Sequence, residues 1–243
     1  MDNAAVNTLW IDHQIGVIQK ICYCSYLEQG HMVNVYSYQE IGNLPPGVVW
    51  KDANGILDQS LVFKDLRNSY ATFSDWFRIA LLYKNGGWWV DSDTICLKKF
   101  NIKDDFAFAT EVVDAIGNVS VCNAIIKMPA NSSIGNAILN EINEIITSKD
   151  VNSILWTEIG ASILNRFIHG FGLEKHLLSP EVFCPIHYFN FKEIFQRQAI
   201  TFPKSTYAVH VWNKMWEWGG IDPENDFGDM SFFQDLKRKY IDT

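Results

Sequence analysis

The first forty residues constrain the fold more than any other part of the chain. Residues 6–11 form a short apolar run that predicts a strand, and residues 15–29 space their apolar side chains along one helical face. Gly30 ends this helix, and residues 31–38 alternate apolar and polar side chains, as a second strand does. A strand-helix-strand unit joins parallel strands. We therefore expect an α/β protein with a mostly parallel central sheet.

The later elements are predicted by the same patterns. A chain of 243 residues, of which 48% are hydrophobic, suits one large α/β domain. In the first half of the chain we expect a turn at 41–50, a short helix at 52–57, a helix from an N-cap at Ser74-Asp75 to about Tyr83, a strand from Trp88 to Asp91, and strands at 106–110 and 120–128. In the second half we expect helices at 134–147 and 158–167, extended segments at 182–191 and 206–212, a loop at 215–230 and a helix at 232–240.

Charge and composition exclude several classes of protein. The net charge of −8 disfavours non-specific binding to nucleic acid or to an anionic membrane. Five irregularly spaced cysteines predict free, mostly buried thiols rather than a disulfide framework. No signal peptide or membrane-spanning segment is recognisable, so we expect a cytoplasmic protein, peripheral to a membrane only through its acceptor. Nine tryptophans exceed what a core of this size needs, so some are expected to line a cleft.

Two aspartates at the end of a predicted strand carry the clearest chemical signal. In extended backbone, residues two apart project to the same side, so Asp91 and Asp93 can present both carboxylates to one point. Their repulsion requires a positive charge between them, and a hard divalent cation that also binds phosphate oxygens meets that need.

The helix before these aspartates adds a second pair. Asp75 and Arg78 share a helical face, and Gly86-Gly87 allows a tight turn into the strand. Arginine suits phosphate or carboxylate, and aspartate suits sugar hydroxyls. Taken singly, the two aspartates read as a solvated turn and the Asp–Arg pair as a helix surface pair. Their order and spacing together indicate a site.

The combined pattern resembles the D-x-D glycosyltransferases of the sugar-binding-region type. These are capsular-polysaccharide and mannosyl- or galactosyltransferase-like enzymes with a GT-A-type, Rossmann-like nucleotide-binding sandwich, and they are distantly similar to the glucosylating clostridial toxins. The resemblance is carried by residues 71–100, and extends to Leu9-Trp10-Ile11, to residues 30–38 and to His210-Val211-Trp212. One departure is visible, because the segment 156–161 lacks the proline of the family's Thr-Gly-Pro motif.

The resemblance implies a donor site, a metal and a division of labour. Residues 1–243 would form one domain, with a donor half at 1–130 and an acceptor half at 131–243 that closes the metal site. The cofactor would be a divalent metal, Mn²⁺ in preference to Mg²⁺, bound by Asp93 and His210 and, through water, by Asp91. The catalytic residues would be Asp75, Arg78, Asp91 and Asp93, and the donor-binding residues Leu9, Trp10, Ser74, Asp75, Arg78, Trp89, Asp91, Ser92, Asn123 and Trp212.

The implied reaction is a retaining transfer of a hexose from a UDP- or GDP-linked sugar to a glycan hydroxyl. No carboxylate is clearly placed as a covalent nucleophile, so a front-side path that relies on positioning and electrostatics is preferred. Alternatives are transfer to a protein side chain, hydrolysis of the nucleotide sugar, and a catalytically inactive carbohydrate-binding relative. A generic metal phosphohydrolase would need more clustered His and Asp ligands than the sequence shows.

Overall fold

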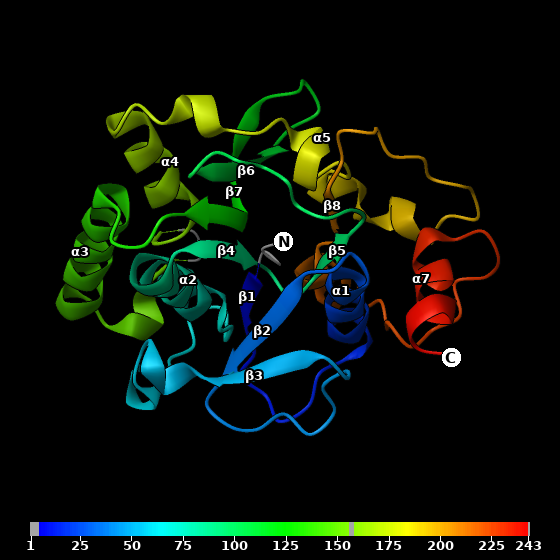
Figure 1. The fold of residues 1–243 in the computed structure, drawn as a ribbon, viewed down its shortest axis with the longest axis horizontal. Helices are drawn as coiled ribbons and strands as arrows, with labels where there is room; N and C mark the ends of the chain where they lie inside the picture. The colour runs from blue at the N-terminus through cyan, green and yellow to red at the C-terminus, as the bar shows by residue number, and fades with distance from the viewer. Residues whose placement is uncertain (1–4, 156–157, 243) are drawn as a thin grey trace.

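A six-stranded sheet in the order β3-β2-β1-β4-β7-β6 forms the centre of the molecule (Figure 1). The structure is a computed structural model that describes residues 5–155 and 158–242. Neighbouring strands are parallel from β3 to β4, and β7 runs antiparallel to both β4 and β6. The mostly parallel α/β sheet is therefore confirmed. Its strands are β1 (Ala5–Leu9), β2 (Met32–Ser37), β3 (Val48–Asp52), β4 (Gly87–Val90), β6 (Ala107–Val112) and β7 (Val119–Met128).

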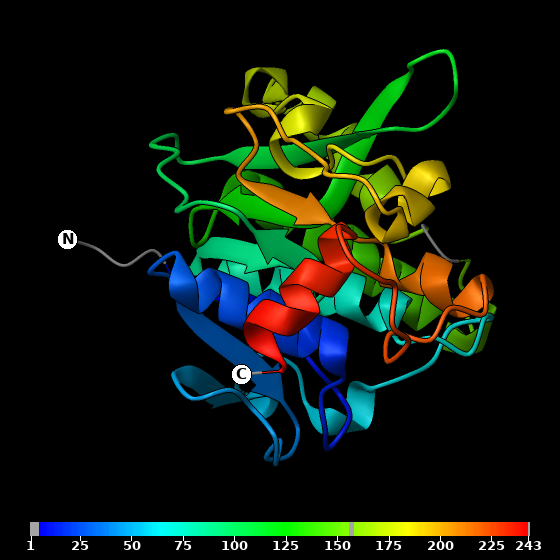
Figure 2. The same cartoon turned by 90° about the vertical axis from the view of Figure 1, so that its right-hand side faces the viewer.

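Helices cover both faces of this sheet, as Figures 1 and 2 show. One face carries α2 (Ala71–Asn85), α3 (Ser133–Ser148) and α4 (Ala161–Gly170). The other carries α1 (Val17–Glu28), α7 (Phe232–Tyr240) and a small sheet of β5 (Thr94–Cys96) with β8 (Ala208–His210). The remaining elements are α5 (Pro180–Phe183), α6 (Asn213–Trp218) and the 3-10 helices η1 (Ala53–Gly55), η2 (Gln59–Leu61), η3 (Val151–Ser153), η4 (Glu174–His176) and η5 (Tyr188–Phe195).

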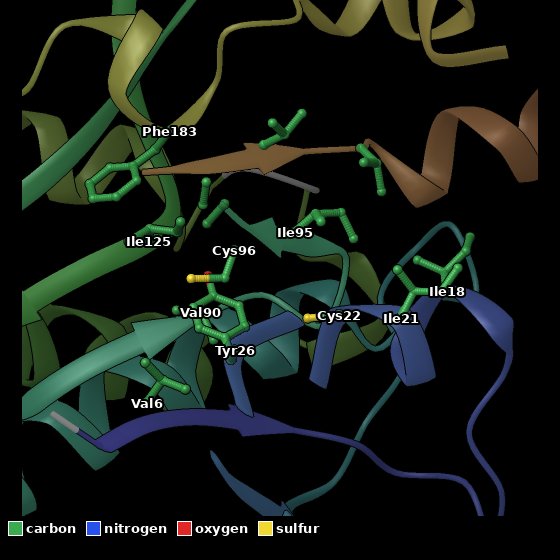
Figure 3. Close-up of a cluster of buried hydrophobic side chains, with 14 of the residues drawn as sticks. Val6, Ile18, Ile21, Cys22, Tyr26, Val90, Ile95, Cys96, Ile125 and Phe183 are labelled. Carbon is green, nitrogen blue, oxygen red and sulfur yellow. The ribbon is translucent and has the colours of Figure 1, made fainter. Parts of the chain in front are cut away.

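The sheet divides the hydrophobic core into two parts. Successive side chains of a strand point to opposite faces, so Trp88 enters the core beneath α1 while Trp89 enters the core beneath α2. Figure 3 shows the first part, where side chains of α1, β4, β5 and α5 interdigitate. Burial on both faces of β4 holds the end of this strand rigidly, and the D-x-D segment begins there.

Two boundaries near the site differ from the sequence expectation. Helix α2 begins at Ala71 and not at an N-cap of Ser74-Asp75, because Thr72 and Phe73 are already buried in the first turn. Strand β3 occupies residues 48–52, where only a turn was expected up to residue 50. This strand is at the sheet edge and largely exposed, so its sequence lacks the apolar alternation of a buried strand.

Two later expectations were wrong. Residues 182–191 are not extended, because the end of α5 and the start of η5 occupy them. Residues 215–230 are not entirely loop, since α6 continues to Trp218. Part of the segment without the family proline, Trp156 and Thr157, lies outside the described residues.

The cysteines agree with the sequence expectation. All five cysteines are free thiols, and four of them are buried. Among the described residues, no helix is both long and apolar enough to cross a membrane.

Candidate active site

The site lies at the carboxyl ends of β1 and β4. These strands are parallel neighbours. The chain continues from β1 to β2 and β3 on one side of β1, and then returns to β4 on its other side, so the strand order reverses here. In α/β sheets, ligands bind in the crevice outside the strand ends at such a switch point. Trp10 follows β1 directly and Asp91 follows β4 directly.

Asp91 and Asp93 approach each other through a turn rather than through strand alternation. Strand β4 ends at Val90, and the carbonyl of Asp91 accepts hydrogen bonds from the backbone N–H and the hydroxyl of Thr94 at 3.2 and 2.9 Å. The expectation of an extended D-x-D segment is therefore wrong, although both side chains still enter one site.

Arg78 joins the helix to this turn. Its guanidinium Nη2 lies 3.1 Å from Asp75 Oδ1 and 3.2 Å from Asp91 Oδ1, and its Nη1 donates to the carbonyl of Asn123. The guanidinium carbon is 5.1 Å from the ring centroid of Trp89, whose Nε1 donates to Asp91 at 2.7 Å. Arg78 is 4% exposed, so the network is preorganised in a poorly hydrated environment.

Asp93 and His210 face each other across the small second sheet. Thr94 pairs with His210 in the β5–β8 register, and this pairing places His210 Nε2 3.3 Å from Asp93 Oδ1. Asp93 Oδ2 accepts the backbone N–H of Asn213 at 2.8 Å. Ligand atoms of Asp91, Asp93 and His210 all lie within 4.8 Å of one another, so the three side chains are able to share one metal ion.

The ring of His210 is held on its other sides as well. It stacks on Trp212 at a centroid distance of 3.8 Å, and Cys122 Sγ lies 4.0 Å from its Nδ1. Trp212 adopts a left-handed backbone conformation with φ of 59°. Its Nε1 donates to the carbonyl of Ile186 at 2.8 Å. These contacts fix the imidazole with Nε2 directed at Asp93.

Burial and charge perturb the titration of the whole cluster. Burial raises the pKa of Asp75 to about 6, against the opposing attraction of Arg78. Burial also raises the pKa of Asp91. Burial opposes the ionisation of Asp93, but the charge and hydrogen bond of His210 outweigh it and lower its pKa. Burial disfavours the charged imidazole of His210, yet Asp93 raises its pKa well above the usual value. Strong perturbation in a cleft is typical of functional sites.

Two cavities meet at this cluster. The smaller, of about 330 Å³, is lined by the end of β1, the start of α2 and the D-x-D turn. The larger, of about 880 Å³, extends from the same turn past His210 to α6 and the end of β6. Arg78, Asp91 and Asp93 line both cavities, so a single ligand is able to pass from one to the other at this point.

Every residue predicted from the sequence for the site lines one or both cavities. The smaller cavity contains Leu9, Trp10, Ser74, Arg78, Trp89, Asp91, Ser92 and Asp93. The larger contains Asp75, Arg78, Asp91, Asp93, Asn123, His210 and Trp212.

Three residues of the site were missed by sequence reasoning. Lys214 lines both cavities, and Glu111 lines the larger. Gly160 packs directly against the carboxylate of Asp75. The only available signal was position, because Lys214 follows the His210-Val211-Trp212 segment closely. Glu111 lies in a segment without a chemical motif, and Gly160 lies in the segment 156–161, which departs from the family's Thr-Gly-Pro motif.

Replacing Asp75 with asparagine should stabilise the fold at neutral pH. A carboxyl whose folded pKa, about 6, exceeds its unfolded value penalises folding once it is ionised. The free-energy cost of ionising Asp75 in the folded protein is absent below about pH 4, increases between about pH 4 and pH 6, and has its full size above about pH 6. We expect Asp75→Asn to raise the free energy of unfolding by about 1–2 kcal/mol at pH 8, and by progressively less down to pH 5. Denaturant unfolding at both pH values measures this, and an equal gain at pH 5 and pH 8 would contradict it.

Comparison with solved structures identifies the class of fold. The chain superimposes on the PaToxG glycosyltransferase with a TM-score of 0.54 and 16% identity, over 71% of this chain and 72% of that one. It superimposes on the ligand-free glycosyltransferase domain of the YGT toxin with a TM-score of 0.51 and 9% identity, over 98% of both. The fold is that of the GT-A glycosyltransferases.

Sequence comparisons match parts of the chain to glycosyltransferase families. Residues 19–111 match the family described as a glycosyltransferase sugar-binding region containing the DXD motif, and residues 172–227 match the alpha 1,4-glycosyltransferase conserved region. The lactosylceramide 4-alpha-galactosyltransferase of Mus musculus is 29% identical over 157 residues, which cover 58% of this chain and only 40% of that relative. Two separate regions of the chain thus match D-x-D and alpha 1,4-glycosyltransferase families, in agreement with the resemblance to D-x-D glycosyltransferases predicted from the sequence.

Proposed function

We propose that this protein transfers a hexose from a nucleoside-diphosphate sugar to a hydroxyl of a glycan, in a metal-dependent reaction that retains the anomeric configuration. The observation that carries the proposal is the meeting of two cavities at Arg78, Asp91 and Asp93. A donor with a flat base at one end, a diphosphate in the middle and a sugar at the other end matches this arrangement.

The donor is proposed to lie with its nucleoside in the smaller cavity. Trp10 and Leu9 offer an aromatic and an apolar surface for the base, and Ser74 and Ser92 offer hydroxyls toward the ribose and phosphates. The sugar then enters the larger cavity. There Asp75 accepts from Asn123 at 2.8 Å and is aligned to accept from a sugar hydroxyl as well.

The D-x-D turn and His210 fit a manganese ion. Two ligands that meet an octahedral ion at right angles lie about 3 Å apart, and His210 Nε2 and Asp93 Oδ1 are separated by 3.3 Å. An imidazole beside carboxylates favours Mn²⁺ over Mg²⁺, which takes oxygen ligands. Asp93 and His210 would bind it directly and Asp91 through water. When bound, the ion would offset the charge that develops on the leaving diphosphate.

The chain's own residues supply the remaining electrostatics. Arg78 is held by Asp75 and Asp91, so it is already oriented when the donor arrives and needs no reorganisation during the reaction. Lys214 adds a second cation where the two cavities join. A front-side path, in which the leaving phosphate receives the proton of the acceptor hydroxyl, requires this positioning and no separate base.

Both halves of the chain contribute to the proposed site. Residues 1–130 would supply most of the donor contacts, and residues 131–243 would supply the acceptor side and close the metal site through His210. The mouse relative's name describes 4-alpha-galactosyl transfer to lactosylceramide. A galactosyl donor and a galactoside acceptor are therefore the first to test.

A panel of UDP- and GDP-linked hexoses with manganese tests the proposal. The correct donor is expected to release nucleoside diphosphate and to raise the melting temperature in the presence of the metal. Equal, weak stabilisation by every nucleotide, without diphosphate release, would instead indicate an inactive carbohydrate-binding relative.

Manganese affinity should rise with pH through neutrality. The pKa of His210 is raised well above its usual value, so a proton competes with the metal for the imidazole. We expect the Mn²⁺ affinity to rise by up to about tenfold for each pH unit between pH 6 and pH 8, as measured by calorimetric titration. His210→Gln should bind the metal weakly and lose this pH dependence, while His13→Gln, at an exposed position, should keep it. The same pH dependence in His210→Gln would exclude His210 as a ligand.

A further inference from the structure

The far end of the larger cavity has more volume and more polar and aromatic side chains than a donor sugar requires. Its volume of about 880 Å³ is near the upper end of small-molecule sites, which span about 300–1,000 Å³. Asp75, Arg78 and Asn123 account for only the end beside the D-x-D turn. The remainder reaches Glu111 at the end of β6 and Trp218 at the end of α6.

Glu111 presents a carboxylate to this space; burial raises its pKa, and the nearby charge of His210 acts against that rise. Glu111 faces the same side of the sheet as Cys122, because it pairs with Ser120, two residues before Cys122 on β7. Within the described part of the chain it makes no side-chain hydrogen bond and no ion pair. An ionised carboxylate only accepts hydrogen bonds, so this group suits a ligand that donates them, as hydroxyls do.

An aromatic wall lies close to the end of β6, where Glu111 is located. The hydroxyl of Tyr188 donates to the carbonyl of Val113 at 3.2 Å, which ties η5 to the residues just after β6. The Tyr188 ring packs edge-on against Trp212 at a centroid distance of 6.2 Å. Trp212 in turn stacks on His210, so this aromatic wall connects Glu111 to the proposed metal site.

Trp218 offers an aromatic face at the mouth of the cavity. Its side chain is 52% exposed, which is unusual for tryptophan, and the guanidinium carbon of Arg67 lies 5.4 Å from its ring centroid. Leu66 and Leu155 are also exposed beside the mouth, at 66% and 61%. A rigid ring with apolar neighbours suits the C–H face of a sugar, which is flat and only weakly hydrated.

We propose, on the basis of the proposed function, that Glu111 and Trp218 form an acceptor subsite for a pyranose. Glu111 accepts hydrogen bonds from hydroxyls of the acceptor sugar, and Trp218 packs against its ring. A pyranose offers neighbouring hydroxyls together with a C–H face, whereas a serine or threonine side chain offers a single hydroxyl and no such face. The acceptor is therefore a neutral glycan rather than a protein side chain.

Separate measurement of donor hydrolysis and of transfer to lactose and methyl β-galactoside tests this subsite. Donor hydrolysis without added sugar reports the proposed function alone. We expect Glu111→Gln and Trp218→Ala to raise the KM for these sugars at least about tenfold, while in Trp218→Ala the donor KM and the hydrolysis rate stay within twofold. Trp218→Phe should recover most of the loss, and Glu144→Gln, on the exposed surface of α3, should change nothing.

Direct sugar binding gives a readout that needs no turnover. Saturation-transfer NMR with the two sugars, manganese and UDP should show binding to the native protein and reduced binding to both variants. An unchanged sugar KM in Glu111→Gln and Trp218→Ala would overturn the subsite. So would modification of a serine- and threonine-containing peptide with no transfer to, or binding of, either sugar. Absence of donor hydrolysis and donor binding in the native protein would instead contradict the proposed function.

Discussion

Replacing Asp93 with alanine should lower donor turnover about 10³-fold, the largest effect expected of any single substitution in this chain. Both carboxylate oxygens of Asp93 are committed at the site, one toward His210 at 3.3 Å and one to the backbone N–H of Asn213 at 2.8 Å. Its removal takes away a proposed direct metal ligand and leaves the charge of His210 without its partner. Nucleotide-sugar turnover with and without manganese, and metal-dependent thermal stabilisation, measure the effect.

Two further variants separate chemistry from folding. Asp93→Asn keeps an oxygen that accepts the Asn213 N–H, so it should lose turnover to a similar degree with a smaller loss of stability, since one such hydrogen bond contributes about 1 kcal/mol. Asp105→Ala removes an exposed aspartate elsewhere on the molecule and should leave turnover intact. Near-native, manganese-stimulated turnover in Asp93→Ala would show that the site assignment is wrong.

Gly160→Ala should lower activity about 100-fold although position 160 carries no chemical group. A Cβ at this position would lie 2.2 Å from Asp75 Oδ2, which is closer than packed atoms allow, and 3.0 Å from Asn123 Nδ2, which is tighter than most packed contacts. Asp75 would have to leave its place between Arg78 and Asn123. A displacement of about 1 Å in a positioning residue is enough for a loss of this size. Donor KM and kcat measure the loss, and denaturant unfolding should show a cost of about 1–3 kcal/mol from overpacking.

The same helix supplies the matched control. Gly170 ends α4 and does not need a positive φ, and a Cβ at this position would meet no heavy atom within 4 Å, so Gly170→Ala should keep full activity. A double variant tests the cause directly. In an Asp75→Ala background the carboxylate atoms nearest to the new methyl are gone and only the looser approach to Asn123 Nδ2 remains, so Gly160→Ala should cost much less stability. An undiminished stability cost in that background would place the strain elsewhere.

The elements that the sequence predicts correctly are those whose signal is local. The helix at 232–240 and the β-α-β opening follow from the spacing of apolar side chains, which burial on one face imposes on neighbouring residues. Edge strand β3 and the 3-10 helix η5 escaped prediction because neither is buried along a single regular face. Their conformation depends on what packs beside them and not on their own periodicity.

For the site, the sequence by itself determined the pairs of residues that are close along the chain. Asp75 and Arg78 are three residues apart on one helix and do form an ion pair. Asp91 and Asp93 are close enough in sequence to meet whatever the backbone does, and they meet in a turn.

Only the tertiary structure decided which residues surround these pairs. Asn213 lies 120 residues from Asp93 and yet holds its carboxylate, and His210 reaches the same group because β8 pairs with β5. Glu111 enters the larger cavity from β6, and Gly160 makes room for Asp75 from the start of α4. Such contacts leave no local pattern, because long-range packing and strand pairing bring these groups together and spacing along the chain does not record them.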